Sequence, residues 1–226
     1  MSITDNIAEI QKNVEAARKK SPHPEQPVTI VAVTKTRTPQ QIQEVLAAGV
    51  PIIGENRVQE LLDKYDAVGP GATWHIIGHL QSNKVKYIAD KVVLVHSLES
   101  ESLAKELDHR MQMLGHPMDC LVQVNIADEE SKFGLAKEDV LSFLEMVSKL
   151  PGIHVKGLMN IAPIFEDTEQ VRPIFREMYQ LFQEIKEKQI PGIDMEILSM
   201  GMSHDYQVAV EEGANMIRVG RSMFAE

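Results

Sequence analysis

The stretch that decides the fold reads Val28-Thr29-Ile30-Val31-Ala32-Val33-Thr34-Lys35-Thr36. Every residue from Val28 to Val33 is apolar or β-branched, and a lysine follows shortly afterwards. Parallel strands that are covered on both faces have continuous apolar runs of this kind. We therefore predict a buried parallel strand with Lys35 at its C-terminal end. A desolvated amine in such a position acts as a nucleophile toward an aldehyde. The alternative is a lysine that simply leaves the sheet for solvent.

The rest of the chain repeats this strand in alternation with amphipathic helices. Further strands are predicted at residues 51–54, 73–78, 91–95, 121–126, 153–158, 195–198 and 215–219. An additional helix precedes the first strand, with Thr4 or Asp5 as its cap. Strict alternation without a break in composition predicts an α/β fold, a single closed (β/α)8 TIM-type barrel with an extra N-terminal helix, over residues 1–226. A doubly wound open sheet is the alternative.

Composition limits the classes of partner. The 226 residues carry a formal net charge of −10, which argues against nucleic-acid binding. An anionic ligand must therefore be held by local features such as glycine-rich loops and individual arginines. The single cysteine, Cys120, lies in an apolar run, so we expect a core residue and no intramolecular disulfide. We see neither a signal peptide nor a membrane span, and we expect a cytoplasmic protein without a membrane partner.

Polar and small residues gather where the predicted strands end. In an α/β barrel the C-terminal ends of the strands carry the functional groups. These positions hold Lys35, residues 54–57, residues 79–84, His96-Ser97, Asn125, Met159-Asn160, residues 199–203 and residues 220–222. The opposite ends of the strands look ordinary. This asymmetry predicts a site at the C-terminal mouth of the barrel.

The last two strand ends have the features of a phosphate pocket. Ser199-Met200-Gly201-Met202-Ser203 leads into a predicted helix, so Ser203 is a candidate N-cap with exposed N–H groups beside it. Gly220 permits close approach of the backbone next to Arg221 and Ser222. Barrel enzymes often hold phosphate with these two loops. The alternative is that Ser203 is only a cap and Gly220 only a turn.

Arg218 lies within the last predicted strand and has the same parity as Gly220. We therefore expect its side chain to point into the barrel mouth. A buried arginine needs a partner. Either a structural carboxylate or a heteroaromatic nitrogen that accepts a hydrogen bond would serve.

Three other motifs do not lead to a function. His75 and His79 have the spacing of a helical zinc pair, but they fall on a strand and its exit, so we predict no metal site. Ser203-His204-Asp205 is consecutive, and consecutive side chains lack the geometry of a catalytic relay. Residues 54–57 do not match a dinucleotide fingerprint, and a Walker A loop is absent from the sequence.

Longer motifs carry a family resemblance over the whole chain. They are Val31-Ala32-Val33-Thr34-Lys35, Gly54-Glu55-Asn56-Arg57-Val58-Gln59-Glu60, residues 74–84 (WHIIGHLQSNK), residues 198–205 (LSMGMSHD) and Ile217-Arg218-Val219-Gly220-Arg221. The chain resembles the pyridoxal phosphate homeostasis protein family. This resemblance implies a fold similar to the N-terminal barrel of alanine racemase, which is a fold-type III pyridoxal 5′-phosphate (PLP) protein, here without the C-terminal β-domain.

The resemblance also implies roles for individual residues. Lys35 matches the lysine that holds PLP as a Schiff base, the internal aldimine, and Arg218 matches the arginine that faces the pyridine nitrogen. The other matches are Ser203 with the backbone of Gly220, Arg221 and Ser222 for the phosphate, Asn56 and Met200 beside the ring, and, with weaker support, His79 and Met159. The family commonly has Thr or Ser where Arg221 stands, although the backbone contact survives this change.

These matches imply a binding protein rather than an enzyme. An arginine beside the pyridine nitrogen leaves the ring largely unprotonated and makes it a weaker electron sink. Racemases with this barrel add a β-domain that closes the site, whereas this chain ends at Glu226, shortly after the phosphate loop. We therefore expect a monomer that carries PLP for homeostasis and hands it to PLP-dependent apo-enzymes without robust turnover.

Two enzymatic alternatives remain open from the sequence. One is a PLP-dependent racemase or lyase of narrow specificity, in which Lys35 is the base on one face and Tyr206 or His204 a second group. The other is a Schiff-base aldolase that uses Lys35 without a cofactor.

Overall fold

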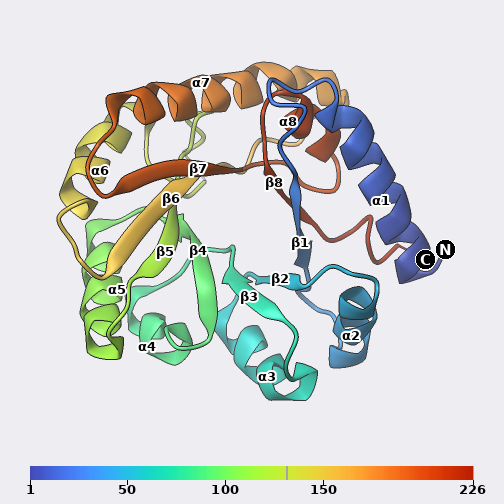
Figure 1. Ribbon diagram of the computed structural model, residues 1–226, viewed down its shortest axis with the longest axis horizontal. Coiled ribbons are helices and arrows are strands. Elements are labelled where there is room, and N and C mark those ends of the chain that lie inside the picture. The colour runs from blue at the N-terminus through green and yellow to red at the C-terminus, as the bar shows by residue number, and fades with distance from the viewer. Residues whose placement is uncertain (131, 226) are drawn as a thin grey trace.

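The chain forms a closed barrel of parallel strands surrounded by helices (Figure 1). The computed structural model describes residues 1–130 and 132–225. The strands are β1 (Thr29–Val33), β2 (Ile52–Glu55), β3 (Thr73–Ile76), β4 (Val92–Leu98), β5 (Met118–Gln123), β6 (Ile153–Met159), β7 (Ile193–Ser199) and β8 (Met216–Val219). They follow one another around the barrel in sequence order, and β8 pairs with β1. The predicted TIM-type barrel is confirmed, and the open-sheet alternative is wrong.

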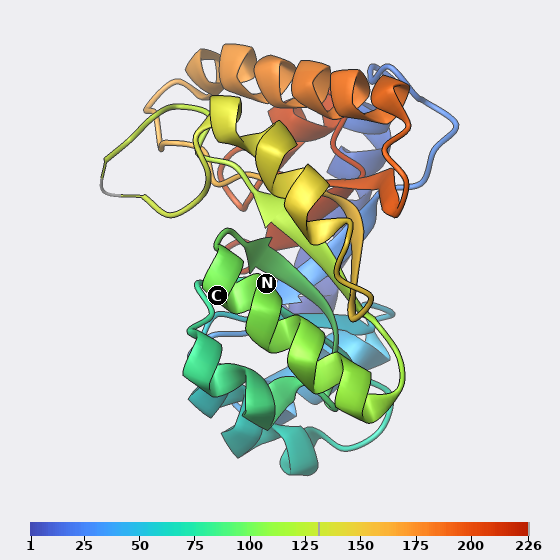
Figure 2. The same cartoon turned by 90° about the vertical axis from the view of Figure 1, so that its left-hand side faces the viewer.

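The helices cover the outside of the barrel. They are α1 (Ile3–Arg18), α2 (Pro39–Ala47), α3 (Val58–Val68), α4 (Val85–Ile88), α5 (Glu101–Leu114), α6 (Val140–Val147), α7 (Arg172–Lys188) and α8 (Tyr206–Glu211), with short 3-10 turns η1 (Ser82–Lys84), η2 (Lys137–Asp139) and η3 (Thr168–Val171). Figure 2 shows α5, α6 and α7 along one side. None of the described helices is long and apolar enough to cross a membrane.

Two apolar layers explain why the strands read as continuous hydrophobic runs. A small inner cluster fills the barrel and includes Val31, Leu94 and Leu121. A larger outer cluster packs the strands against the helices and includes Ala32, Ile53 and the fully buried Cys120, which is the core residue we predicted. Because successive residues of a strand point alternately inward and outward, both sets must be apolar.

The extra N-terminal helix closes over the end of the chain. Asn6 on α1 donates hydrogen bonds to the carbonyl oxygens of Met223 and Ala225, at 3.1 and 2.8 Å. Ala225 and the start of α1 consequently lie close together. The cap of α1 is Ser2, whose hydroxyl and backbone form a capping box with Asp5. Our prediction of Thr4 or Asp5 as the cap was therefore wrong, because Asp5 is the reciprocal partner inside the first turn.

Several boundaries differ from the predicted ones, and those of β4 and α8 change the placement of predicted site residues. Strand β4 continues to Leu98, so His96 and Ser97 lie within the strand and not after it. Helix α8 begins at Tyr206 with Asp205 as its N-cap residue, so Ser203 is not the cap we predicted. Asp205 Oδ1 accepts the N–H of Met202 at 2.7 Å and thereby closes the turn that leads into the helix. This leaves the hydroxyl of Ser203 for another contact.

Candidate functional site

Lys35 lies beyond the end of β1, between the loops that follow β2 and β8. The N–H of Thr34 donates to the carbonyl oxygen of Gly54 at 3.1 Å, which extends the pairing toward β2. On the other side, a Cβ added to Gly220 would stand 3.0 Å from the carbonyl oxygen of Val33. Lys35 is exposed, and its amine takes part in none of the hydrogen bonds or ion pairs found among the described residues. The amine is therefore available to a ligand at the barrel mouth.

The loops after β7 and β8 converge on one oxygen atom. Ser203 Oγ accepts hydrogen bonds from the backbone N–H groups of Gly220 and Ser222, both at 3.2 Å. The N–H of Arg218 donates to the carbonyl oxygen of Gly201 at 3.0 Å and ties the same two loops together. Successive N–H groups that point to one spot form an anion-binding nest. Because α8 is very short, this nest, and not a helix N-terminus, is the feature that fits a phosphate.

Glycines make this close approach possible. The predicted role of Gly220 is consistent with the backbone of Val33 behind it, which leaves little room for a side chain. Gly201 has φ +97°, and a Cβ on it would stand 2.6 Å from the Cβ of Ala209. A side chain at Gly201 would be strained by both its backbone conformation and its surroundings.

Arg218 is buried and points into the barrel, as its parity predicted. It is 2% exposed. Its Nη1 donates to Ser199 Oγ at 2.6 Å, and its Nη2 donates to the carbonyl oxygen of Asn160 at 2.9 Å. Burial lowers the pKa of Arg218 to about 10, and the charge of Asp205 opposes this shift. In the described part of the chain no carboxylate accepts a hydrogen bond from this guanidinium, so a structural carboxylate is not its direct partner.

A chain of buried hydrogen bonds continues from Ser199 across the barrel interior. Ser199 Oγ lies 3.1 Å from His96 Nδ1, and His96 Nε2 lies 2.9 Å from His75 Nδ1. Because Arg218 donates to Ser199, the serine hydroxyl is free to donate to His96 Nδ1, and we assign the proton of His96 to Nε2. Burial lowers the pKa of His75 to about 4 and the pKa of His96 well below its ordinary value. Both rings are consequently neutral at pH 7.

The other residues that the family resemblance implied are more scattered. Asn56 directly follows β2, and its buried Oδ1 has no hydrogen-bond partner among the described residues. Arg221 is exposed beside the nest. Met200 also stands at the right strand end, but its side chain is fully buried in the outer core layer. That Met200 lies beside the ring of a cofactor stays a prediction, and its backbone is the part that stands at the mouth.

His79 and Met159 had weaker support and lie in different surroundings. Met159 belongs to the apolar cluster inside the barrel. His79 is outside, where its ring stacks on Phe133 with 4.0 Å between centroids and its Nδ1 lies 2.6 Å from Glu99 Oε1. His75 is buried within β3 and pairs with His96, so the two histidines of this motif do not converge. No group of three or more metal-binding side chains occurs in residues 1–130 and 132–225.

Unpartnered buried oxygens mark the same end of the barrel. Among the described residues five such side-chain atoms occur: Glu55 Oε2, Asn56 Oδ1, Ser97 Oγ, Asn160 Oδ1 and Ser222 Oγ. They lie near the C-terminal ends of β2, β4, β6 and β8 or directly after them. Buried polar groups are normally satisfied by protein, water or ligand. Their concentration here supports a binding site at the mouth.

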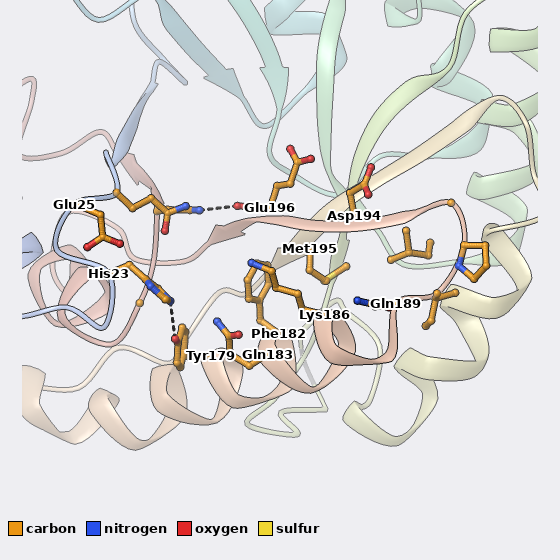
Figure 3. A pocket seen from close by; sticks show the side chains of 17 residues that line it. His23, Glu25, Tyr179, Phe182, Gln183, Lys186, Gln189, Asp194, Met195 and Glu196 are labelled. Atoms are coloured by element: carbon orange, nitrogen blue, oxygen red, sulfur yellow. Dashed lines mark hydrogen bonds between the residues drawn. The ribbon is translucent and has the colours of Figure 1, made fainter.

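Hollows in the surface occur at both ends of the barrel. A groove of about 480 Å³ at the C-terminal end is lined by residues that include Asn56, Arg57 and His79. A wider groove of about 840 Å³ lies at the other end, between α7 and the start of β7 (Figure 3). Its polar wall includes a hydrogen bond of 2.9 Å between His23 and Tyr179. Since the lysine, the nest and the unpartnered oxygens all lie away from this wider groove, size does not identify the site.

The two side chains of the enzymatic alternative are engaged elsewhere. The hydroxyl of Tyr206 accepts a hydrogen bond from Asn13 on α1 at 3.2 Å, so it faces the outer helix layer. His204 is exposed and its Nε2 lies 2.8 Å from the carbonyl oxygen of Phe165. Neither arrangement supplies a second acid or base beside Lys35.

A charged network behind Lys35 was not predicted from the sequence. Lys64 is buried on α3 and contacts Glu55 and Glu60. The spacing of Glu60 and Lys64, four residues apart on a helix that follows a strand end, was the available signal. Similarly, two histidines inside apolar strands signalled the buried pair of His75 and His96.

Comparison with known proteins agrees with the geometry. Residues 6–226 match the family described as alanine racemase, N-terminal domain. The chain is similar to the pyridoxal phosphate homeostasis protein of Aquifex aeolicus, with 38% identity over 100% of this chain and 99% of that protein. It is 34% identical to the Escherichia coli K12 protein of the same name, over 98% of this chain and 95% of that protein.

Solved structures give the same result. PipY of Synechococcus elongatus, solved with PLP bound, superposes with a TM-score of 0.86 at 32% identity and covers 99% of this chain and 100% of its own. A Bifidobacterium adolescentis protein described as unknown has a TM-score of 0.91 at 31% identity and covers 98% and 94% of the two chains. The fold and the site thus define a barrel of the alanine racemase N-terminal type. Within that class, the chain belongs to the pyridoxal phosphate homeostasis protein family.

The residues present fit PLP. The nest of Gly220 and Ser222 N–H groups suits its phosphate, and Ser203 Oγ already marks the point of convergence. The buried Arg218 offers a donor to the ring nitrogen, and Lys35 offers an amine to the aldehyde.

Proposed function

We propose that this protein binds PLP and holds it reversibly on Lys35 as a Schiff base, so that the cofactor is buffered and kept available. The observation that carries this proposal is the convergence of the Gly220 and Ser222 N–H groups on a single point. This nest occurs in a protein of net charge −10, which otherwise repels anions.

The chain's own residues supply binding and orientation. The nest would hold the phosphate, Arg218 would donate to the ring nitrogen, and Lys35 would bond to the aldehyde carbon. In that condensation a C=N bond forms while the carbonyl oxygen leaves as water with the two amine protons, and hydrolysis reverses it. When bound, the group would supply an electron sink, which an arginine at the ring nitrogen keeps weak.

We also propose release to PLP-dependent apo-enzymes rather than turnover on the protein itself. The hydroxyl of Tyr206 is held by Asn13 on α1, so this candidate for a second proton-transfer group does not face Lys35. We further propose a monomeric cytoplasmic protein, which light scattering after size-exclusion chromatography would test for its oligomeric state. Transfer is tested by mixing the loaded protein with an apo-enzyme and measuring the activity that the apo-enzyme gains.

The decisive experiment is the visible absorption spectrum of the purified protein titrated with PLP. We expect a new band in the wild type that is lost in Lys35→Ala. Borohydride treatment before PLP is added should abolish this band only in protein that already carries bound cofactor, because the reduction then traps that cofactor on the lysine. Mass spectrometry after borohydride reduction of the loaded protein should find the cofactor on the peptide that contains Lys35. A wild type without a Lys35-dependent band would refute the proposal. Rapid racemisation or decarboxylation of common amino acids would refute the part that excludes turnover.

A further inference from the structure

The backbone on both sides of Lys35 is attached to helix α3. The carbonyl oxygen of Thr34 accepts a hydrogen bond from Lys64 Nζ at 2.8 Å. The N–H of Thr36 donates to Glu60 Oε2, also at 2.8 Å. The residues directly before and after Lys35 are thus held by side chains of one neighbouring helix, while the Lys35 side chain remains exposed.

Lys64 is the centre of this attachment. Besides Thr34, its ammonium group donates to Glu55 Oε1 at 2.8 Å and to Glu60 Oε2 at 3.2 Å. The three contacts match the three protons of the ammonium group. The Lys64 side chain is 10% exposed, and that of Glu55 is completely buried. A buried charge with all its donors used has a fixed position, unlike a surface lysine.

The attachment also holds an unusual backbone conformation. Thr36 has φ 62°, which lies in the left-handed region that a β-branched residue rarely adopts. Such a conformation persists only where the surroundings hold it. The Glu60 carboxylate is the group that accepts the Thr36 N–H, and this same hydrogen bond is the largest cause that lowers the pKa of Glu60. The chain direction directly after Lys35 therefore depends on Glu60.

We propose that Glu60 and Lys64 are positioning residues that hold the Lys35 amine in place for its reaction with an aldehyde. The inference rests on the proposed function and adds two residues to its site. Attack on a carbonyl carbon requires a narrow range of distance and direction, so an amine on a fixed backbone reacts faster and binds more tightly than one on a mobile loop. Neither side chain needs to touch the cofactor for this effect.

The first test compares variants at Glu60, which lies at the surface edge of the network and is not required for the core. Glu60→Ala removes the acceptor of the Thr36 N–H. We expect its affinity for PLP and its rate of band formation to fall by roughly tenfold to a hundredfold. Glu60→Gln retains an oxygen that accepts this N–H and should restore most of the loss. The matched control is Asp63→Ala on the same helix, because Asp63 is exposed and accepts its hydrogen bond from Gln59, away from Lys35.

The second test separates positioning from collapse of the site. Pyridoxine 5′-phosphate carries an alcohol in place of the aldehyde, so it occupies the nest without bonding to Lys35. Its affinity should be the same in Glu60→Ala and in the wild type. In a Lys35→Ala background, adding Glu60→Ala should leave PLP affinity unchanged, because the residue that Glu60 positions is gone.

The outcomes are distinguishable. A wild type without a Lys35-dependent band would overturn the proposed function and this inference with it. A wild type with that band, together with Glu60→Ala behaviour equal to the wild type, would overturn the positioning role alone. An equal loss of affinity for PLP and pyridoxine 5′-phosphate in Glu60→Ala would also overturn it, since that result means general damage to the site.

Discussion

Arg218 donates a hydrogen bond from Nη1 to the hydroxyl oxygen of Ser199 over 2.6 Å, and this contact sets the direction of the buried chain that leads to His75. A guanidinium group can only donate, so Ser199 must accept from it and pass its own proton toward His96. The arginine that faces the barrel mouth is thereby oriented from behind by buried groups. The chain joins β8, β7, β4 and β3 across the barrel interior.

Replacing Ser199 with alanine should therefore destabilise the protein. The variant leaves an Arg218 donor and His96 Nδ1 buried without their partner, which costs about 1–3 kcal/mol of the free energy of unfolding. Urea unfolding followed by circular dichroism measures this change. Ser142→Ala is the matched control, since Ser142 is exposed on α6 and a change there should stay within about 0.5 kcal/mol. Equal stability of both variants would show that the Ser199 contact contributes little.

The buried histidines should make the protein less stable in mild acid. The pKa of His75 is about 4 in the folded state, against 6.5 for an ordinary histidine. Below pH 6.5 His75 binds a proton in the unfolded chain, whereas in the folded chain it does so only near pH 4. The contribution of neutral His75 to the free energy of unfolding is thus complete above pH 6.5. It falls as the pH drops toward 4, by up to about 3 kcal/mol.

Urea unfolding at a series of pH values checks this dependence. His75→Gln should flatten the slope between pH 6.5 and 4, whereas His109→Gln should leave it unchanged because His109 is exposed on α5. A wild-type stability that stays constant across this range would contradict the neutral buried pair.

The barrel could be predicted from the sequence because each strand and helix is marked by a pattern of neighbouring residues. Strand β1 was predicted from a continuous apolar run that needs no knowledge of distant residues. The start of α2 is equally local, because Thr38 caps it with a capping box and Pro39 is its first residue. The strand ends then located Lys35, Arg218 and Gly220, since parallel strands bring their C-terminal ends to one side.

The contacts between distant side chains could not be predicted in the same way. Ser203 was predicted to cap the helix that follows it, and only the three-dimensional arrangement shows that its hydroxyl accepts the N–H groups of Gly220 and Ser222 instead. The attachment of Thr36 to Glu60 joins residues 24 positions apart, and no local pattern specifies such a pair. Met200 illustrates the reverse case, because a correct strand end did not reveal which layer its side chain enters.

Removal of the charge on Lys64 should be costly for stability. Lys64→Met leaves the fully buried Glu55 without its cation, and an uncompensated buried charge costs about 3–5 kcal/mol. Burial already raises the pKa of Glu55, in opposition to its contact with Lys64. Lys64→Met combined with Glu55→Gln should recover part of this loss, because the second change removes the unpaired charge.

An exposed ion pair provides the control for this prediction. Lys137 and Glu177 lie 2.9 Å apart with both side chains 44% exposed, so Lys137→Met should change stability by less than about 1 kcal/mol. Thermal unfolding of the three variants and the wild type under identical conditions gives the comparison. A loss for Lys64→Met that is no larger than the loss for Lys137→Met would contradict a tightly held buried group.

Replacing Ser203 with alanine should weaken the binding of phosphate-bearing ligands selectively. In the wild type the Ser203 oxygen accepts the N–H groups of Gly220 and Ser222. Its hydroxyl proton therefore remains free to donate to a phosphate oxygen, and a hydrogen bond to a charged group contributes about 1.5–3 kcal/mol. We expect PLP affinity to fall roughly tenfold or more, whereas the weaker affinity for pyridoxal, which lacks the phosphate, should not change. Isothermal titration with both ligands measures the difference, and Ser142→Ala, an exposed serine on α6, is the control. Equal losses for PLP and pyridoxal would mean that Ser203 supports the site as a whole and not its phosphate end.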